Sequence, residues 1–323
     1  MTVFQSYEWN MLVLKQYFNS CYNRLFSTVY CYETENAIAP IIVQKKGISF
    51  RWIGRKKGIY FLGVNSYSDY LNFIYSDIQE TELIELINEI RDDFDKLPFY
   101  LTFVREDTLT QKICVEYEAE LYHKMVSVEV HLPNSKSDYD KQLTKSTRQN
   151  LRTSLNRMRR DNVEYKLDIK NGIIGQTLAD KLVPIHLRRV LEKNSVSNGI
   201  VNSISNWLRR RQLVYSENNN NIVNNAMRTL PNSILIICEL DGQIAGYLYG
   251  LTEESTVRIL QNCFVDEYKF YSPMIRGTYD FLVKQIENRE ISCVDFTRGD
   301  EGYKYKLGGI DVNLYSYLIN RNL

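Results

Sequence analysis

Two acidic residues and one basic residue follow a short apolar run near the end of the chain. Asp295, Arg298 and Asp300 come at the end of the run Ile291–Phe296, which has the composition of a buried strand. Ligands of such sheets bind where strands end, so Asp300 could accept a proton or bind a hydroxyl group. Arg298 could hold a carboxylate or a phosphate. The alternative is an Arg–Asp pair that only stabilises the turn.

The cysteines and histidines predict no metal site. The six cysteines include no C-x-x-C pair, and three of them lie in strand-like runs, where a free thiol behaves as a small apolar side chain: Cys238, Cys263 and Cys293. The three histidines lack metal-ligand spacing with one another or with any cysteine: His123, His131 and His186. A Cys–His nucleophile pair stays an open alternative.

A strongly basic segment lies in the middle of the chain. Residues 141–160 contain seven basic side chains and no acidic one: Lys141, Lys145, Arg148, Arg152, Arg157, Arg159 and Arg160. An apolar stripe through Leu143, Leu151, Leu155 and Met158 predicts a helix with one buried side. The basic side chains form either a solvated face or a contact for a phosphate through Arg148 or Arg152. Binding of nucleic acid is the weakest of the three interpretations, because no stacking motif follows.

The composition is that of an ordinary globular protein. The chain has 323 residues, 44% of them apolar, and a net charge of +1. These values exclude fibrous, disordered and disulfide-scaffold classes, and they give no overall field towards nucleic acid or an anionic membrane. The longest apolar runs have about five residues, far fewer than the roughly 20 that span a bilayer. Without a signal peptide at the N-terminus, we expect a cytoplasmic protein with no membrane partner.

The first part of the chain predicts a mixed fold. Apolar residues at helical spacing indicate helices at 11–18 and 80–94. Short apolar runs indicate strands at 37–43, 48–53, 59–64, 99–104 and 126–132. The polar stretch Pro133–Asp138 then suggests a boundary between two domains, residues 1–135 and 136–323.

The second part shows a clearer order of elements. Helices are expected at 177–191 and 207–214, and a surface loop at 217–225, where six of nine residues are Asn. A hairpin turns at Asp241-Gly242 between strands 234–240 and 244–251. A strand at 256–265, a helix that opens with Ser272-Pro273 and strands at 291–296 and 312–319 follow. The strand–helix–strand crossover predicts parallel strands with a ligand at their ends.

This order, together with five short sequence words, resembles the acyl-CoA N-acyltransferase (GNAT) superfamily. The words are Phe4–Trp9, Ser68–Ile74, Ser146–Arg152, Tyr271–Pro273 and Asp295–Lys304. The branch that is most similar contains the acetyltransferase-like proteins of bacterial cellulose and exopolysaccharide genes, which are related to the tandem-domain peptidoglycan aminoacyl transferases. The resemblance implies an α/β (α+β) fold of two GNAT-like domains packed side by side, each a mixed central sheet flanked by helices.

The resemblance also implies where the acyl donor binds. The second domain of such proteins holds the acyl thioester, and the cleft between the domains takes the acceptor. The phosphates of the donor would lie at the start of the helix that opens with Ser272, near Met274, Ile275, Arg276 and Gly277. Relatives place Gly directly after Ser-Pro, where this chain has Met274. Backbone N–H groups at Asn262, Cys263 and Phe264 would polarise the thioester carbonyl.

The remaining site residues follow from the same resemblance. Tyr303 occupies the position of the tyrosine that protonates the leaving thiolate; the alternative is a packing tyrosine. Asp300 and Asp295 are candidate catalytic carboxylates, and the candidate acceptor-binding residues are Asp69, Tyr70, Arg148, Arg298 and Lys304. Asp69 and Tyr70 otherwise stabilise a loop.

The resulting hypothesis is an N-acyltransferase that moves an acyl group from acyl-CoA to the amine of an amino sugar, in a nucleotide-linked form, for surface polysaccharide synthesis. It needs acyl-CoA as co-substrate, no metal and no nucleic-acid partner. One alternative is a transferase that uses aminoacyl-tRNA on a peptidoglycan precursor, with the basic helix on the tRNA. Another is a catalytically inactive GNAT-like module that binds a partner.

Overall fold

The chain folds into two compact units. The computed structural model describes residues 2–19, 21–45, 56–64, 68–196 and 222–323. The first unit combines Met1–Ser127 with Asp311–Leu323, and the second unit is Val128–Ile310. Strand β6 (Glu120–His131) runs through the division between them without a break. No helix of the described residues has the length and apolarity needed to cross a bilayer.

The first unit is built on a mixed sheet. Its strands follow the order β1 (Ser27–Glu33), β2 (Ala37–Gln44), β3 (Gly58–Phe61), β5 (Phe99–Arg105), β12 (Ile310–Ile319) and β6, and the short β4 (Ile74–Tyr75) pairs with β2. Strands β3 and β5 are parallel, whereas β1–β2, β2–β3 and β5–β12 are antiparallel. The helices of this unit are η1 (Val3–Gln5), α1 (Tyr7–Phe18), α2 (Cys21–Phe26), α3 (Glu80–Asp92) and α4 (Leu109–Glu116).

Helix α3 shows why periodicity predicts this unit well. Leu83, Leu86, Ile87 and Ile90 recur at helical spacing, and each is at most 2% exposed. The predicted helices at 11–18 and 80–94 are confirmed, as are the strands at 37–43 and 99–104. The predicted strand at 48–53 lies outside the described residues.

The second unit is also built on a mixed sheet. Its strands follow the order β6, β11 (Cys293–Arg298), β10 (Thr256–Phe264), β9 (Gln243–Glu253), β8 (Ser233–Leu240) and β7 (Tyr165–Asn171). Its helices are α5 (Lys136–Gln142), α6 (Lys145–Arg160), α7 (Gln176–Val196), α9 (Ile222–Thr229), η2 (Asp266–Tyr271), α10 (Pro273–Asn288) and α11 (Gly302–Lys306).

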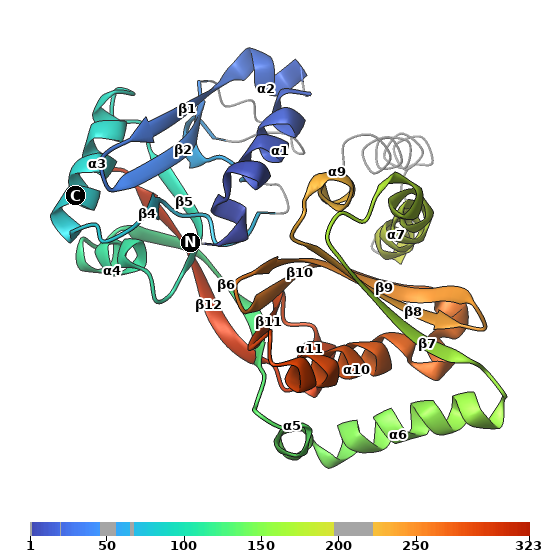
Figure 1. Cartoon of the computed structure of the whole chain (residues 1–323). Helices are drawn as coiled ribbons and strands as arrows, with labels where there is room; N and C mark the ends of the chain where they lie inside the picture. The colour runs from blue at the N-terminus through green and yellow to red at the C-terminus, as the bar shows by residue number, and fades with distance from the viewer. Residues whose placement is uncertain (1, 20, 46–55, 65–67, 197–221) are drawn as a thin grey trace. The chain divides into compact units, whose positions relative to one another are not determined.

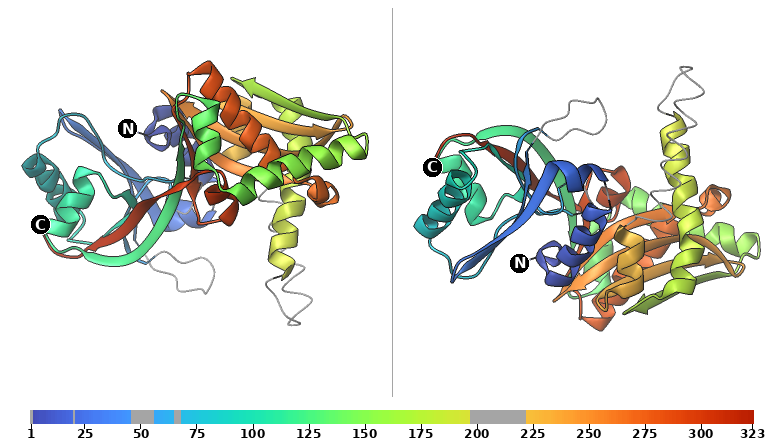
Figure 2. Two further views of the ribbon diagram at one scale, coloured as in Figure 1. Left: turned by 90° about the horizontal axis from the view of Figure 1, so that it is seen from below. Right: turned by 90° about the horizontal axis from the view of Figure 1, so that it is seen from above.

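Helices cover both faces of this sheet (Figure 1). Helix α10 packs on one face against β7, β8 and β9, and α5 and α6 contact α10 there, while α7 and α9 lie together on the opposite face. Figure 2 shows α6 alongside α10 from below. The apolar stripe predicted for the basic helix is confirmed. Leu151 and Met158 are buried in α6, and Leu143, just before the helix, is also buried.

The predicted hairpin is present, with the turn that its residues favour. Strands β8 and β9 pair antiparallel up to Leu240 and Gln243. Asp241 and Gly242 between them have φ values of 50° and 71°. Two successive positive φ angles match the twist of the strands and suit the Asp-Gly dipeptide.

Three expectations differ from the structure. The division falls after Ser127, within β6, rather than within Pro133–Asp138, because the last residues of β6, Val128–His131, group with the second unit. The last strand, β12, belongs mainly to the first unit, although its position in the sequence suggests the second. The expected Asn-rich loop ends sooner, because helix α9 already begins at Ile222. The predicted helix at 207–214 lies outside the described residues.

Candidate active site

A cavity of about 860 Å³ lies in the second unit, where β10 ends and α10 begins. Strand β10 contributes Asn262, Cys263 and Phe264, and the start of α10 contributes Ser272, Pro273, Met274 and Ile275. Helix α7 adds His186 and Arg189, and α11 adds Tyr303. We call this site the β10–α10 cavity. Its place at the ends of strands is the one that parallel strands favour for ligands.

Strand β10 lines the cavity with the part that extends beyond its pairing with β11. The two strands pair in parallel only from Thr256 to Arg258 on β10, although β10 continues to Phe264. Beyond that point the hydroxyl group of Thr297 donates a hydrogen bond to the carbonyl oxygen of Ile259 at 2.9 Å. A side chain thus replaces the next ladder hydrogen bond, and the ends of the two strands are left apart for a ligand.

The start of helix α10 borders the cavity with a backbone conformation of its own. Ser272 has φ 51° and ψ 47°, and its side chain makes no capping hydrogen bond. Pro273 follows as the first helical residue. The sequence correctly places Ser272 and Pro273 at the helix start, but the serine does not act as an ordinary cap. The N-terminal end of the helix, which carries partial positive charge, is therefore left for another partner.

The five residues assigned to the start of this helix divide into two groups. Ser272, Met274 and Ile275 line the β10–α10 cavity. Arg276 instead donates from Nε to Asp280 at 2.7 Å, one turn further along the helix. Gly277 packs against β8, where a Cβ atom would lie only 2.0 Å from Sγ of Cys238. The second group therefore positions the helix rather than lining the cavity.

Met274, the residue that replaces the glycine of relatives, has a packing role. Its side chain is 8% exposed and passes over Gly246 of β9, where a Cβ atom would lie 2.3 Å from its sulfur. The same Cβ atom would lie 2.8 Å from the carbonyl oxygen of Cys263. Gly246 thus makes room for Met274, and the helix start stays close to β10 without blocking the cavity.

His186 and Cys263 form a buried pair in the cavity wall. The Nδ1 atom of His186 lies 3.2 Å from Sγ of Cys263, and the two residues are 8% and 1% exposed. When Nδ1 carries the proton and donates to sulfur, Nε2 becomes the basic nitrogen of the ring. In that tautomer the pair offers a proton acceptor in the wall of the β10–α10 cavity.

Tyr303 and Asn262 form a second polar pair in the cavity. The pKa of Tyr303 is raised to about 12, because burial, the largest cause, and the charge of Glu301 raise it by more than a hydrogen bond with the side chain of Asn262 lowers it. The phenol therefore keeps its proton at neutral pH and can donate a hydrogen bond. Oδ1 of Asn262 is buried and accepts no hydrogen bond from the part of the chain that the structure describes.

Basic side chains lie at the edge of the same cavity. The guanidinium of Arg189 lies 4.3 Å from the ring centre of Phe264 and 3.9 Å from Asp266. Lys269, from η2, also lines the cavity and is exposed. These two cations line the cavity together with two acidic side chains, Asp266 and Glu301, so the N-terminal end of α10 is the feature that favours an anion there.

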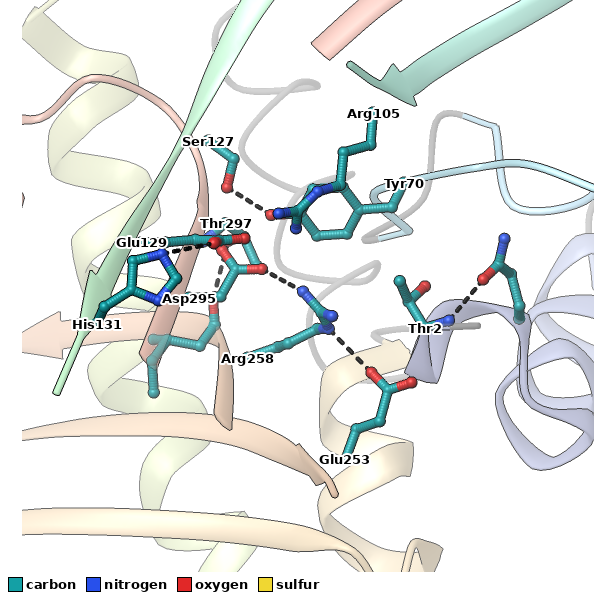
Figure 3. A network of polar contacts seen from close by, with 12 residues as sticks. Thr2, Tyr70, Arg105, Ser127, Glu129, His131, Glu253, Arg258, Asp295 and Thr297 are labelled. Atoms are coloured by element: carbon teal, nitrogen blue, oxygen red, sulfur yellow. Dashed lines mark hydrogen bonds and ion pairs between the residues drawn. The ribbon is translucent and has the colours of Figure 1, made fainter. Parts of the chain in front are cut away.

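The three charged residues at the end of β11, Asp295, Arg298 and Asp300, do not line the cavity. Asp295 is fully buried, pairs with Arg258 and accepts a hydrogen bond from the backbone N–H of Thr297 at 2.7 Å (Figure 3). Asp300 is exposed, Arg298 is half-buried, and neither lines the β10–α10 cavity.

Lys304 and Arg148 are both engaged by backbone carbonyl groups. Nζ of the buried Lys304 donates to the carbonyl oxygens of Thr297, Arg298 and Gly299 at 2.9 to 3.1 Å. It thereby stabilises the turn after β11. Arg148 donates to the carbonyl oxygens of Asp140 and Leu143, at the start of α6.

Asp69 and Tyr70 lie buried in the first unit. Their exposed fractions are 4% and 2%, and the hydroxyl groups of Tyr70 and Ser127 share a hydrogen bond (Figure 3). Tyr70 has φ 55°, in the left-handed region that few side chains adopt. These two residues shape the loop before β4.

Seven residues that line the cavity are absent from the sequence-based site: His186, Arg189, Val190, Asp266, Lys269, Pro273 and Glu301. His186 is 77 residues from Cys263 in the sequence, and no motif spacing links them. The open alternative of a Cys–His pair is the one signal that points towards this contact.

Comparison with known proteins identifies one family. Residues 145–305, which include every residue that lines the cavity, match the family described as Acetyltransferase (GNAT) domain. No curated protein matches the chain in sequence.

Three solved structures share the fold over almost the whole chain. A conserved protein of unknown function from Bacteroides thetaiotaomicron is 15% identical, with a TM-score of 0.53 over 94% of this chain and 89% of that one. L-PGS from Bacillus licheniformis is 10% identical, with a TM-score of 0.53 over 98% and 92%. FemX is 10% identical, with a TM-score of 0.51 over 99% and 92%. At these identities the similarity concerns the fold alone.

Proposed function

The chain belongs to the GNAT superfamily, and on that basis we propose that it transfers an acyl group from acyl-CoA to the amine of an amino sugar. The observation that carries the proposal is the β10–α10 cavity, which lies at the end of β10, beyond its pairing with β11, and reaches the start of a long helix. An extended thioester arm fits between strands that have stopped pairing, and a diphosphate fits the positive end of a helix.

The donor is held at both of its ends. The start of α10 and Lys269 bind the diphosphate, and Arg189, which pairs with Asp266 at 3.9 Å, lines the same cavity. At the other end, the backbone of Asn262, Cys263 and Phe264 borders the cavity, and its N–H groups polarise the thioester carbonyl. The buried Oδ1 of Asn262, which has no hydrogen-bond donor within the described residues, accepts an N–H group of a substrate.

His186 acts as the base. The amine attacks the thioester carbon, its proton passes to Nε2 of His186, the new C–N bond forms and the C–S bond breaks. In the tautomer that carries the proton on Nδ1, this atom donates to Sγ of Cys263, 3.2 Å away, and Nε2 is left to accept the proton of the amine. His186 afterwards releases the proton to solvent or to the free thiolate.

Tyr303 stabilises the leaving thiolate. Its pKa of about 12 lies above the value of about 8.5 for an ordinary thiol, so full proton transfer from the phenol to the thiolate is unfavourable. A hydrogen bond from the phenol to sulfur is therefore its contribution.

The acceptor is an amino sugar in nucleotide-linked form, because the resemblance is to proteins of surface-polysaccharide pathways. Arg298 and Asp300, on the turn after β11, are the acceptor contacts in the second unit, where Arg298 suits a phosphate and Asp300 a hydroxyl group. Asp69, Tyr70 and Arg148 stay candidate acceptor contacts on the resemblance alone.

Direct turnover measurements test the proposal. Purified protein is incubated with acetyl-, butyryl- or hydroxybutyryl-CoA and a panel of free and nucleotide-linked amino sugars, and thiol release and product mass are measured. The proposal predicts one acyl-CoA and amino-sugar pair with a product heavier by the acyl group. Absence of turnover with every pair contradicts it.

A second candidate function is transfer from an aminoacyl-tRNA. Two observations favour it: the fold is similar to that of FemX and L-PGS, and α6 exposes Lys145, Arg152 and Arg159. If the protein binds tRNA with an affinity that falls steeply with salt, and transfers the aminoacyl group, then aminoacyl-tRNA rather than acyl-CoA is the donor.

A catalytically inactive module is the third candidate. It predicts no thermal shift on addition of CoA, whereas a ligand at 100 times its Kd stabilises the folded protein by about 2.7 kcal/mol.

A further inference from the structure

A separate group of polar side chains lies on the neighbouring strands β6 and β11, outside the β10–α10 cavity. Glu129 and His131 are alternate residues of β6 and so project from the same face of the sheet. Cys293 is the first residue of β11. One ligand atom from each side chain lies within 4.8 Å of the others. We propose that Glu129, His131 and Cys293 bind one zinc ion.

The three side chains offer the donor set that zinc prefers. Zn²⁺ accepts thiolate sulfur, imidazole nitrogen and carboxylate oxygen in one tetrahedral site. Mg²⁺ and Ca²⁺ take oxygen ligands, so the thiol and the imidazole select against them. On binding, the thiol of Cys293 loses its proton to solvent and coordinates as thiolate.

The distances fit a shared ion after a small adjustment. Ligand atoms that are each about 2.0 to 2.3 Å from a tetrahedral zinc lie roughly 3.3 to 3.8 Å from one another. Nε2 of His131 and Oε2 of Glu129 are 3.5 Å apart, and Figure 3 shows the imidazole turned towards the carboxylate. A separation of up to 4.8 Å requires a shift of about 1 Å. The His131 side chain, which is 59% exposed, has room to make that shift.

Burial divides the ligands into a fixed pair and an accessible third. The side chain of Glu129 is 4% exposed and Cys293 is 8% exposed, so the sheet holds both in place. The backbone N–H of Leu132 donates to the carbonyl oxygen of Ser292 at 2.8 Å and keeps the two strands together beside the group. The exposed His131 gives the ion a path from solvent. Water completes the fourth position.

Such an ion joins the last residues of β6 to the first residue of β11. It adds to the interactions that these side chains already make and stabilises the folded second unit by mass action. The sequence does not reveal the group, because Cys293 is distant from the other two ligands and only the strand order brings it beside them.

Cobalt titration tests the proposal, because tetrahedral Co²⁺ with a thiolate ligand absorbs light that the protein alone does not. Protein freed of metal by a chelator is titrated with Co²⁺ and then with Zn²⁺. We expect one Co²⁺ per chain, sulfur-to-cobalt charge-transfer absorption, and displacement of cobalt by one Zn²⁺. Absence of saturable binding at that ratio overturns the proposal.

Three variants assign the ligands, each with circular dichroism to confirm folding. Cys293→Ser loses the charge-transfer absorption. His131→Ala weakens the binding of Co²⁺ by more than the roughly 10- to 100-fold that is typical when a residue hydrogen-bonded to a metal ligand is lost. His123→Ala, which removes another exposed histidine of the same strand, leaves binding unchanged. Charge-transfer absorption that survives in Cys293→Ser, or equal binding in His131→Ala and His123→Ala, overturns the assignment.

Discussion

The Nδ1 atom of His186 lies 3.2 Å from the Sγ atom of Cys263, although the two residues are 77 positions apart in the sequence. The contact joins helix α7 to strand β10, and both residues line the β10–α10 cavity. The proposed base and the strand that we propose polarises the acyl carbonyl are thereby held against each other. The proposed chemistry depends on this contact.

Replacement of the base tests its role. His186→Gln keeps a polar side chain of similar size but accepts a proton poorly, so we expect kcat to fall by about 10²- to 10⁴-fold with little change in the KM for acyl-CoA. The rise of rate with pH that a single base produces disappears in the variant. Thiol release measured over a range of pH checks both effects. His123→Gln serves as control, and a rate for His186→Gln within about threefold of that control contradicts the role.

The tyrosine of the cavity has a distinct pH signature. Burial raises the pKa of Tyr303 to about 12 from an ordinary value of 10.0, so its proton is fully present below pH 10 and is lost only as pH rises through about 12. Tyr303→Phe therefore lowers kcat by a constant factor of about 10 to 100 throughout the neutral range, if loss of one donor costs 1.4 to 2.7 kcal/mol. If the ratio of kcat between the wild-type protein and Tyr303→Phe changes between pH 6 and 9, a group other than Tyr303 causes the loss of rate.

The packing of α10 on β8 gives a prediction on stability. Gly277→Ala places a methyl group 2.0 Å from the original position of Sγ in Cys238, so we expect a loss of about 1 to 3 kcal/mol in the free energy of unfolding. Urea unfolding of Gly277→Ala, Cys238→Ala and the double variant measures the interaction energy between the two positions. We expect the double variant to be more stable than the sum of the single effects predicts, by at least about 0.5 kcal/mol. Gly302→Ala, where a Cβ atom meets nothing within 4 Å, is the matched control. An equal effect at both glycines contradicts the packing argument.

Asp295 and Asp300, within and just after β11, should contribute unequally to stability. Asp295 is fully buried and pairs with Arg258, which also pairs with Glu253, so Asp295→Ala removes one of the two carboxylates that bind this cation and lowers the free energy of unfolding by about 1 to 3 kcal/mol. Asp300→Ala, at an exposed position, changes stability by less than about 0.5 kcal/mol. Guanidinium unfolding compares them. Similar unfolding midpoints for the two variants contradict this division.

Local patterns in the sequence predict most of the elements of both units. The spacing of Leu83 and Ile87 gives α3, the stripe through Leu151 and Met158 gives α6, and Asp241-Gly242 gives the hairpin. Each of these features depends on neighbours within about one or two turns of chain, which is the range over which periodicity and turn chemistry act.

Features that depend on distant contacts are not predictable in this way. The sequence marks Lys304 as a substrate contact, but three carbonyl groups of the preceding turn bind its ammonium. Strand β12 pairs with β5, whose residues are some 200 positions away. His186 likewise meets Cys263 only because α7 packs on β10. A single sequence contains no local signal that would reveal such contacts between distant residues.

Hydrogen–deuterium exchange on addition of CoA shows whether the donor binds in the β10–α10 cavity, because it locates the ligand along the chain. We expect slower exchange at the amides of residues 262–264 and 274–276, which lie at the end of β10 and the start of α10, and unchanged exchange in strands β1 and β2. Protection confined to other segments, or no protection at saturating CoA, would contradict the claim that the β10–α10 cavity holds the acyl donor.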